Sequence, residues 1–142
     1  MNFAKRVVLD TSTLIGAALR PDSTPRQALL AAVASATLCA SPATMAELER
    51  VLLRDKFDRY LDPTDRREFL ELYRRHARLF NATAAEEAAL PRPCRDPRDN
   101  KFLALAVYCA ADTLVSSDDD LLVLHPYQGM PILTPKEFLQ RL

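Results

Sequence analysis

Glycine and histidine are scarce in this chain of 142 residues, which has two of each and no tryptophan. Two glycines are too few for the glycine-rich loop that cradles phosphate in many nucleotide-binding proteins. The two histidines, His76 and His125, lie beside no serine motif, which argues against a Ser-His-Asp hydrolase. Any catalysis by this chain would therefore have to use other side chains.

Cysteines and long apolar runs are also few. Cys39, Cys94 and Cys109 are odd in number and lack CxxC spacing, so they indicate reduced thiols and a cytoplasmic protein. No apolar run approaches the roughly 20 residues of a membrane span. The N-terminus lacks the apolar core of a signal peptide. We therefore expect a protein that is neither exported nor anchored in a membrane.

Neither sign of charge is in excess, because 19 basic residues balance 19 acidic residues. Net charge consequently gives no argument for binding to nucleic acids or membranes. A hydrophobic fraction of 49% is typical of a globular protein, and the length fits one domain that spans residues 1–142.

Apolar segments of the chain alternate between strand-like and helix-like patterns, which favours a parallel sheet covered by helices on both faces. The patterns predict strands at 7–9, 38–40, 81–82, 113–115 and 131–133, and helices at 14–19, 24–36, 42–52, 65–80, 101–110, 117–124 and 136–142. Thr24, Ser41 and Thr134, each followed by proline, are predicted helix caps.

The segment from Asp65 to Phe80 has the strongest amphipathic pattern in the chain. Its apolar side chains form one stripe that includes His76 and Leu79, while its arginines, Arg66 among them, lie largely off that stripe. We therefore expect His76 in the core or at its boundary.

Acidic residues follow two of the predicted strands. Asp10 comes directly after strand 7–9, and Asp118 comes after strand 113–115 and two serines. Because loops at the carboxyl ends of parallel strands converge on one rim, both carboxylates point to the same place. Asp99 heads a helix and could approach that rim, and Glu47 lies one to two turns into the helix after the second strand.

Each of these acids alone has an ordinary structural explanation. Asp10 and Asp99 could cap helices, and an aspartate in the run after Ser117 could stabilise a turn. Glu47, three residues before Arg50, could be solvated. If all four converge, however, each pair at about 4 Å and an effective dielectric near 20 repels by about 4 kcal/mol, which requires a cation or protonation. Ligand sets made of oxygen select Mg²⁺ or Mn²⁺.

Four stretches of the chain together resemble a known family: VVLDTSTLIGAAL, SPATMAELERVL, CRDPRDNKFLALA and ADTLVSSDDDLLVL. In order and spacing they are similar to the motifs of PIN-domain ribonucleases, in particular the bacterial toxins of toxin–antitoxin pairs. The resemblance extends from about Arg6 to Leu139. It implies a PIN-like fold of three layers, α/β/α, around a central parallel sheet of four to five strands.

The resemblance also implies a set of site residues. Its metal-binding and catalytic acids fall on Asp10, Glu47, Asp99 and Asp118, with Asp120 a frequent additional ligand. Supporting positions fall on Ser12, Asp96, Ser116 and Ser117. The family usually carries glycine directly before the fourth acid, where this sequence has Ser117.

The activity implied by the resemblance is that of an endoribonuclease, dependent on Mg²⁺ or Mn²⁺, that cleaves RNA with metal-activated water. Such proteins commonly form homodimers and are blocked by a cognate antitoxin. The arginines between Arg50 and Arg98 would hold the RNA backbone, or they form an ordinary solvated face. Two alternatives stay open: a catalytically idle PIN-like module that binds RNA or protein, and a receiver-like domain in which one aspartate accepts a phosphoryl group.

Overall fold

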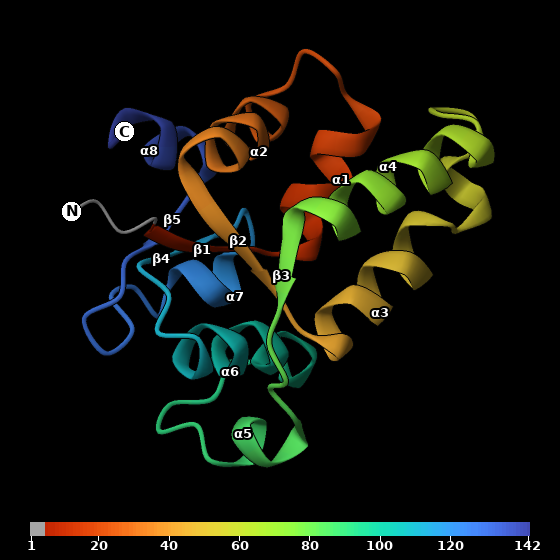
Figure 1. The fold of residues 1–142 in the computed structure, drawn as a ribbon. Helices are drawn as coiled ribbons and strands as arrows, with labels where there is room; N and C mark the ends of the chain where they lie inside the picture. Colours follow the sequence, from red (N-terminus) through yellow and green to blue (C-terminus); the bar gives the residue numbers. More distant parts are fainter. Residues whose placement is uncertain (1–4) are drawn as a thin grey trace.

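A computed structural model describes residues 5–142 and shows one five-stranded sheet with all strands parallel (Figure 1). The strand order is β3-β2-β1-β4-β5. The strands are β1 (Lys5–Leu9), β2 (Ala36–Ala40), β3 (Ala77–Leu79), β4 (Thr113–Val115) and β5 (Ile132–Leu133). The chain adds strands on one side of β1 as far as β3 and then crosses to its other side with β4.

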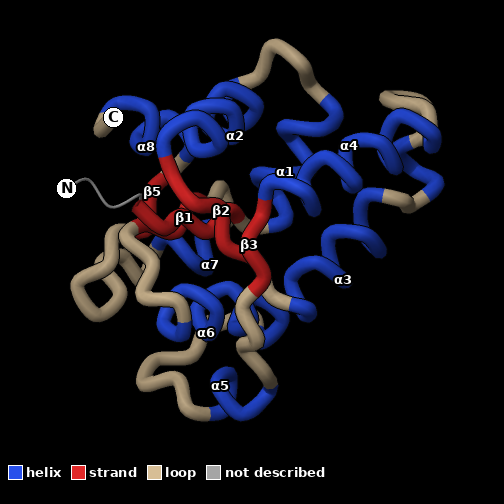
Figure 2. Tube along the Cα trace, in the orientation of Figure 1, coloured by secondary structure: helices blue, strands red, loops and turns tan. Residues whose placement is uncertain are grey.

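Helices connect the strands and cover the sheet (Figure 2). They are α1 (Thr11–Leu19), α2 (Thr24–Ser35), α3 (Pro42–Leu52), α4 (Pro63–His76), α5 (Ala84–Ala88), α6 (Asn100–Tyr108), α7 (Asp119–Leu122) and α8 (Pro135–Gln140), with 3₁₀ turns η1 (Asp55–Phe57) and η2 (Pro97–Asp99). Ser41 and Thr134 cap α3 and α8 as predicted, whereas the cap of α2 is Ser23 and not Thr24.

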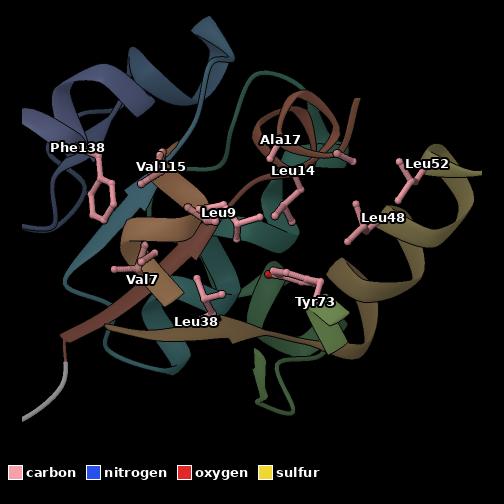
Figure 3. Close-up of a cluster of buried hydrophobic side chains, with 14 of the residues drawn as sticks. Val7, Leu9, Leu14, Ala17, Leu38, Leu48, Leu52, Tyr73, Val115 and Phe138 are labelled. Carbon is pink, nitrogen blue, oxygen red and sulfur yellow. The ribbon is translucent and has the colours of Figure 1, made fainter. Parts of the chain in front are cut away.

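The two faces of the sheet carry separate hydrophobic clusters, because side chains alternate along a strand. Val7 and Leu9 of β1 face a cluster built with α1, α2, α3, α4 and α8, part of which Figure 3 shows. Val8 faces the opposite cluster, to which α6 contributes Phe102 and Leu103. Helices therefore lie on both faces, and the predicted three-layer α/β/α arrangement around a parallel sheet is confirmed, with five strands.

The predicted helix from Asp65 to Phe80 is wrong in its last turn. Helix α4 ends at His76, and residues 77–79 form the edge strand β3, which pairs with β2. The backbone becomes extended at Ala77, because pairing with β2 supplies the hydrogen bonds that a further helical turn would have made. The strand expected near Asn81–Ala82 therefore lies earlier, and Leu79 is 60% exposed.

Two side chains of α4 also lie in the opposite environment to the one predicted. His76 is exposed, whereas Arg66 is fully buried. The Arg66 guanidinium donates to the carbonyl oxygens of Leu52 (2.8 Å) and Arg54 (3.0 Å) and pairs with Asp58. Burial of this arginine is tolerated because its donors are satisfied by the connection between α3 and α4, a long-range contact that periodicity does not reveal.

Between Lys5 and Leu142, no helix combines the length and the apolar character needed to cross a membrane. All three cysteines are free and buried. The expectation about an export signal rests partly on residues 1–4, which lie outside the described residues.

Candidate functional site

Strands β1 and β4 are neighbours, and their carboxyl ends bring Asp10 and Ser116 together. Leu9 pairs with Val115 in the sheet, so the residues that follow them leave the sheet side by side. Both side chains are buried, Asp10 at 3% exposure and Ser116 at 0%. Ser116 Oγ donates to Asp10 Oδ2 over 2.5 Å. This is the position where the strand order reverses, the usual ligand site of an open parallel sheet.

Ser116, Thr13 and Ser12 all donate hydrogen bonds to the Asp10 carboxylate. The backbone N–H of Thr13 donates to Oδ1 over 2.9 Å, so Asp10 does cap α1. Ser12 Oγ lies 3.0 Å from Oδ1 and 3.1 Å from Oδ2. Burial raises the pKa of Asp10 above its ordinary value, and the hydrogen bonds from Ser116, Thr13 and Ser12 oppose that rise. Asp10 therefore both caps α1 and lies at the rim where β1 and β4 end.

A chain of hydrogen bonds continues from Ser116 to the acids after β4. Ser116 Oγ accepts from the backbone N–H of Asp118, and Asp118 Oδ1 accepts from that of Asp120, each over 2.9 Å. Ser117, the other serine predicted to support the site, is exposed. Within residues 5–142 the left-handed backbone region holds only Ala110, Gln128 and Gly129, so the serine before Asp118 fits without strain.

Asp99 lies against the same group of acids. Single carboxylate oxygens of Asp96, Asp99 and Asp120 lie within 4.8 Å of one another. Burial, and then the nearby carboxyls of Asp118, Asp96 and Asp10, raise the pKa of Asp99 to about 7. Its Oδ2 is buried and accepts no hydrogen bond from residues 5–142. Although Asp99 stands at the N-cap position of α6, its side chain makes no capping hydrogen bond, so the capping explanation fails for this residue.

Asp96 is attached to the group more loosely. It caps the turn η2, and Arg98 contacts both of its carboxylate oxygens at 2.9 to 3.1 Å. The Arg98 guanidinium holds the pKa of Asp96 below its ordinary value. Asp96 therefore both shapes the loop before α6 and adds an oxygen to the acidic cluster.

Glu47 approaches from α3 but has its own partners. Lys101 Nζ lies 2.7 Å from Oε1, and Thr11 Oγ1 donates to Oε2 over 2.5 Å. The side chain of Glu47 is 12% exposed, so it is not the solvated residue that its spacing from Arg50 allowed. Of the predicted acids, Asp10, Asp118 and Asp120 thus all lie near Asp99, and Glu47 contacts the site through Thr11 of α1 and Lys101 of α6.

Two residues of this site, Thr11 and Lys101, were not predicted from the sequence. Both stand next to predicted positions: Thr11 follows Asp10, and Lys101 comes two residues after Asp99. Adjacency to a predicted acid is the only available signal. That the two side chains meet Glu47, on a different helix, depends on the packing of α1 and α6 against α3.

A family model described as the PIN domain matches residues 6–120. A search of curated proteins found no match.

Crystal structures of known proteins share the fold, among them three with TM-scores above 0.5. VapBC2 from Rickettsia felis bound to a DNA fragment from its promoter matches with a TM-score of 0.63 and 12% identity, over 89% of this chain and 96% of that one. PAE2754 from Pyrobaculum aerophilum matches with a TM-score of 0.61 and 14% identity, over 96% and 88% of the two chains. VapC20 from Mycobacterium tuberculosis, a Sarcin-Ricin loop cleaving toxin, matches with a TM-score of 0.56 and 12% identity, over 82% and 94%. The predicted PIN-like fold is thereby confirmed.

Proposed function

The chain belongs to the PIN domain family, and from this premise we propose that it is an endoribonuclease that depends on Mg²⁺ or Mn²⁺. The observation that carries the proposal is the buried Oδ2 of Asp99, which has no hydrogen-bond partner in residues 5–142 while other carboxylates surround it. A receiver-like domain is set aside, because the family model that matches residues 6–120 describes a PIN domain.

The residues present fit a hard divalent cation. An orphaned buried carboxylate oxygen is costly unless a proton or a cation meets it. The clustered donor atoms of Asp96, Asp99 and Asp120 are all carboxylate oxygens, which favours Mg²⁺ or Mn²⁺ over zinc. Asp10, Asp99, Asp118 and Asp120 would hold the ion, with Asp96 beside them. A bound ion supplies a lowered pKa for its water and positive charge for phosphate oxygens.

The chain itself contributes fixed positions for these acids. Ser116 and the Thr13 N–H leave Asp10 little freedom to rotate, because each bonds a different carboxylate oxygen. Ser12 is exposed and shares its hydroxyl between both oxygens, so it is the partner that yields most easily to an incoming ligand. Hydrolysis would join a water oxygen to phosphorus and break one P–O bond of the RNA backbone, with the hydrogen atoms of that water divided between the two products.

Some arginines predicted to hold the RNA backbone are engaged elsewhere. Arg66 is buried, and Arg74 pairs with Glu71 and Glu49. Arg67, Arg75 and Arg95 are exposed and remain candidates for phosphate contacts. Fewer arginines are therefore candidates for phosphate contacts than the sequence alone suggests.

A groove beside the acids suits single-stranded RNA. It has a volume of about 350 Å³, and its lining includes Ser12, Arg20, Phe57 and Tyr60. Tyr60 is 53% exposed, and the guanidinium of Arg59 lies 4.8 Å from the centre of its ring. Unpaired bases stack on exposed aromatic rings, and arginines contact the phosphates between them. We assign this groove to nucleotides next to the cleaved bond.

We further propose that the chain is the toxin of a type II toxin–antitoxin pair and acts in the cytoplasm as a homodimer. The support is the sequence resemblance, together with fold neighbours that include VapBC2 and VapC20, a Sarcin-Ricin loop cleaving toxin. Three free, buried thiols fit a reducing compartment. A cognate antitoxin would cover the acidic site.

The test is cleavage of single-stranded and hairpin RNA by purified protein with Mg²⁺, Mn²⁺ or EDTA. Asp10→Asn and Asp118→Asn should each lower the rate at least about a hundredfold, because each removes a charge that the ion needs. Asp119→Asn is the matched control, since Asp119 is the exposed neighbour of Asp118. This variant should cleave RNA at the rate of the wild type.

The contrary results are equally specific. Equal rates in all variants, or full cleavage in EDTA, would mean a contaminating nuclease and remove the support for an acid-site enzyme. Binding of RNA by every variant without any cleavage would favour the catalytically idle module instead.

A further inference from the structure

The first turn of α6 places a lysine directly on one of the predicted metal-binding acids. Lys101 Nζ lies 2.7 Å from Glu47 Oε1, and the two side chains are only 17% and 12% exposed. Thr11 Oγ1 occupies the other oxygen, Oε2, and an arginine guanidinium, that of Arg50, lies 3.9 Å from Oε1. Both oxygens of Glu47 therefore have partners, in contrast to the orphaned Oδ2 of Asp99.

The helix itself gives no reason for a cation at this position. The N-terminal turn of a helix carries a partial positive charge, which disfavours lysine there. Lys101 is the second residue of α6, so its charge is stabilised by Glu47 and not by the helix that carries it. A contact between α3 and α6 with this little solvent exposure is also screened less than a surface ion pair.

Glu47 also stands apart from the other acids in its geometry. The described part of the chain contains one cluster of acidic oxygens close enough to share a cation, and it consists of Asp96, Asp99 and Asp120. Asp118 and Asp10 are the further acids that act on Asp99. A first cation can thus be held without Glu47, whereas a second would need oxygens on the α3 side of the site.

We propose that Lys101 is a positioning residue that takes the place of a second cation: its ammonium neutralises Glu47, and the site binds one divalent ion. This inference rests on the proposed function, because it assumes that the acids bind a metal. In this arrangement Glu47 joins α1, α3 and α6 and shapes the site without contacting the ion. Removal of the ammonium would leave Glu47 Oε1 without its closest partner, and a second divalent ion could then bind that oxygen.

The stoichiometry of Mn²⁺ binding tests the proposal without any measurement of cleavage. Calorimetric titration of the full chain, with free Mn²⁺ counted by electron paramagnetic resonance, should give one equivalent for the wild type. Lys101→Met should bind a second, weaker equivalent. Lys101→Arg keeps the charge and should bind one, and so should the double variant Lys101→Met with Glu47→Gln. Lys5→Met, an exposed lysine at the opposite end of β1, is the matched control.

The affinity of the first equivalent gives a second, independent readout. Glu47→Gln keeps an oxygen that accepts from Lys101, and its amide N–H can donate to Thr11 Oγ1, so it should fold and change that affinity by no more than about threefold. Asp118→Asn should weaken it at least about tenfold, the usual scale for a lost ligand or its close support.

The possible failures can be told apart. Two equivalents in the wild type, one equivalent in Lys101→Met, or an equal loss in Glu47→Gln and Asp118→Asn would overturn the role given to Lys101 and leave the nuclease proposal standing. Absence of any Mn²⁺ binding in the wild type would overturn both.

Discussion

Ser116 Oγ lies 2.5 Å from Asp10 Oδ2, inside the protein and at the junction of β1 and β4. The same oxygen accepts a hydrogen bond from the backbone N–H of Asp118. One hydroxyl thus fixes the relative positions of two acids that come from strands more than a hundred residues apart in sequence. Its importance to the site lies in this geometry, because it contributes no charge.

Ser116→Ala should therefore weaken the site without unfolding the protein. The variant leaves Asp10 Oδ2 without its closest donor and frees the loop that carries Asp118. We expect a loss of about 10- to 100-fold in Mn²⁺ affinity and in RNA cleavage, as for other residues that orient metal ligands. Ser117→Ala, at the exposed neighbour, should match the wild type in both measurements. Similar losses in the two variants would mean that the loop, and not the buried hydroxyl, sets the site.

The raised pKa of Asp99 predicts how stability without metal depends on pH. The pKa is about 7 in the folded protein, against an ordinary value of 3.8. Between these values the folded state holds a proton that the unfolded chain has released. The free energy of unfolding therefore falls as pH rises from about 4 to about 7. The stability that the protonated Asp99 adds to the folded state is fully present only below about pH 4.

Asp99→Asn should remove this part of the pH dependence. In EDTA at about pH 8, the variant should melt about 2–4 °C above the wild type, since it no longer buries a charge, and the gap should shrink toward about pH 5. Mg²⁺ should stabilise the wild type more than the variant. Thermal denaturation followed by circular dichroism measures each quantity. A variant that melts below the wild type at high pH without metal would contradict the assignment.

Much of the fold could be predicted from the sequence, because its strongest signals are local. Buried strands such as Val7–Leu9 and caps such as Ser41-Pro42 depend on neighbouring residues, and both are where the sequence places them. The error at residues 77–79 has the opposite origin. A three-residue edge strand exists only through its pairing with β2, so the helical periodicity of Leu79 and Phe80 was misleading.

The candidate site also has a part that could be predicted from the sequence and a part that could not. Asp10 and Asp118 could be placed on one rim by topology alone, because both follow parallel strands. The partners of Glu47 could not, since Thr11 and Lys101 reach it only through the packing of three helices. Nor could the two serines before Asp118 be distinguished: one is buried against Asp10 and the other is exposed, a difference set by the direction in which the chain leaves β4.

The groove beside Ser12 predicts a separate effect on RNA binding. Tyr60→Ala should weaken binding of a single-stranded oligoribonucleotide about 5- to 100-fold, which corresponds to the loss of one stacked base. Tyr60→Phe keeps the ring and should bind nearly as well as the wild type. Tyr108→Ala removes an exposed tyrosine on α6, which does not line the groove, and serves as the control. Fluorescence anisotropy with Asp10→Asn protein measures binding without cleavage. Equal affinities for Tyr60→Ala and Tyr108→Ala would exclude base stacking in this groove.

Arg66 gives a prediction about stability that also concerns this groove. Its buried guanidinium bonds the carbonyl oxygens of Leu52, Arg54 and Leu61, so it closes the connection that carries Phe57 and Tyr60. Arg66→Met fills a similar volume but leaves those oxygens without donors, and we expect a loss of about 2–4 kcal/mol in the free energy of unfolding.

Arg66→Lys should recover little of that loss, because an ammonium cannot reproduce the planar fork of donors. Arg67→Met, at the exposed neighbour, should stay within about 0.5 kcal/mol of the wild type in urea denaturation. An Arg66→Met variant with the same free energy of unfolding as the wild type would show that apolar contacts hold the connection between α3 and α4 instead. If the loss of stability is confirmed, Arg66→Lys should also bind RNA more weakly. The reason is that Arg66 holds the segment between α3 and α4, which carries Tyr60.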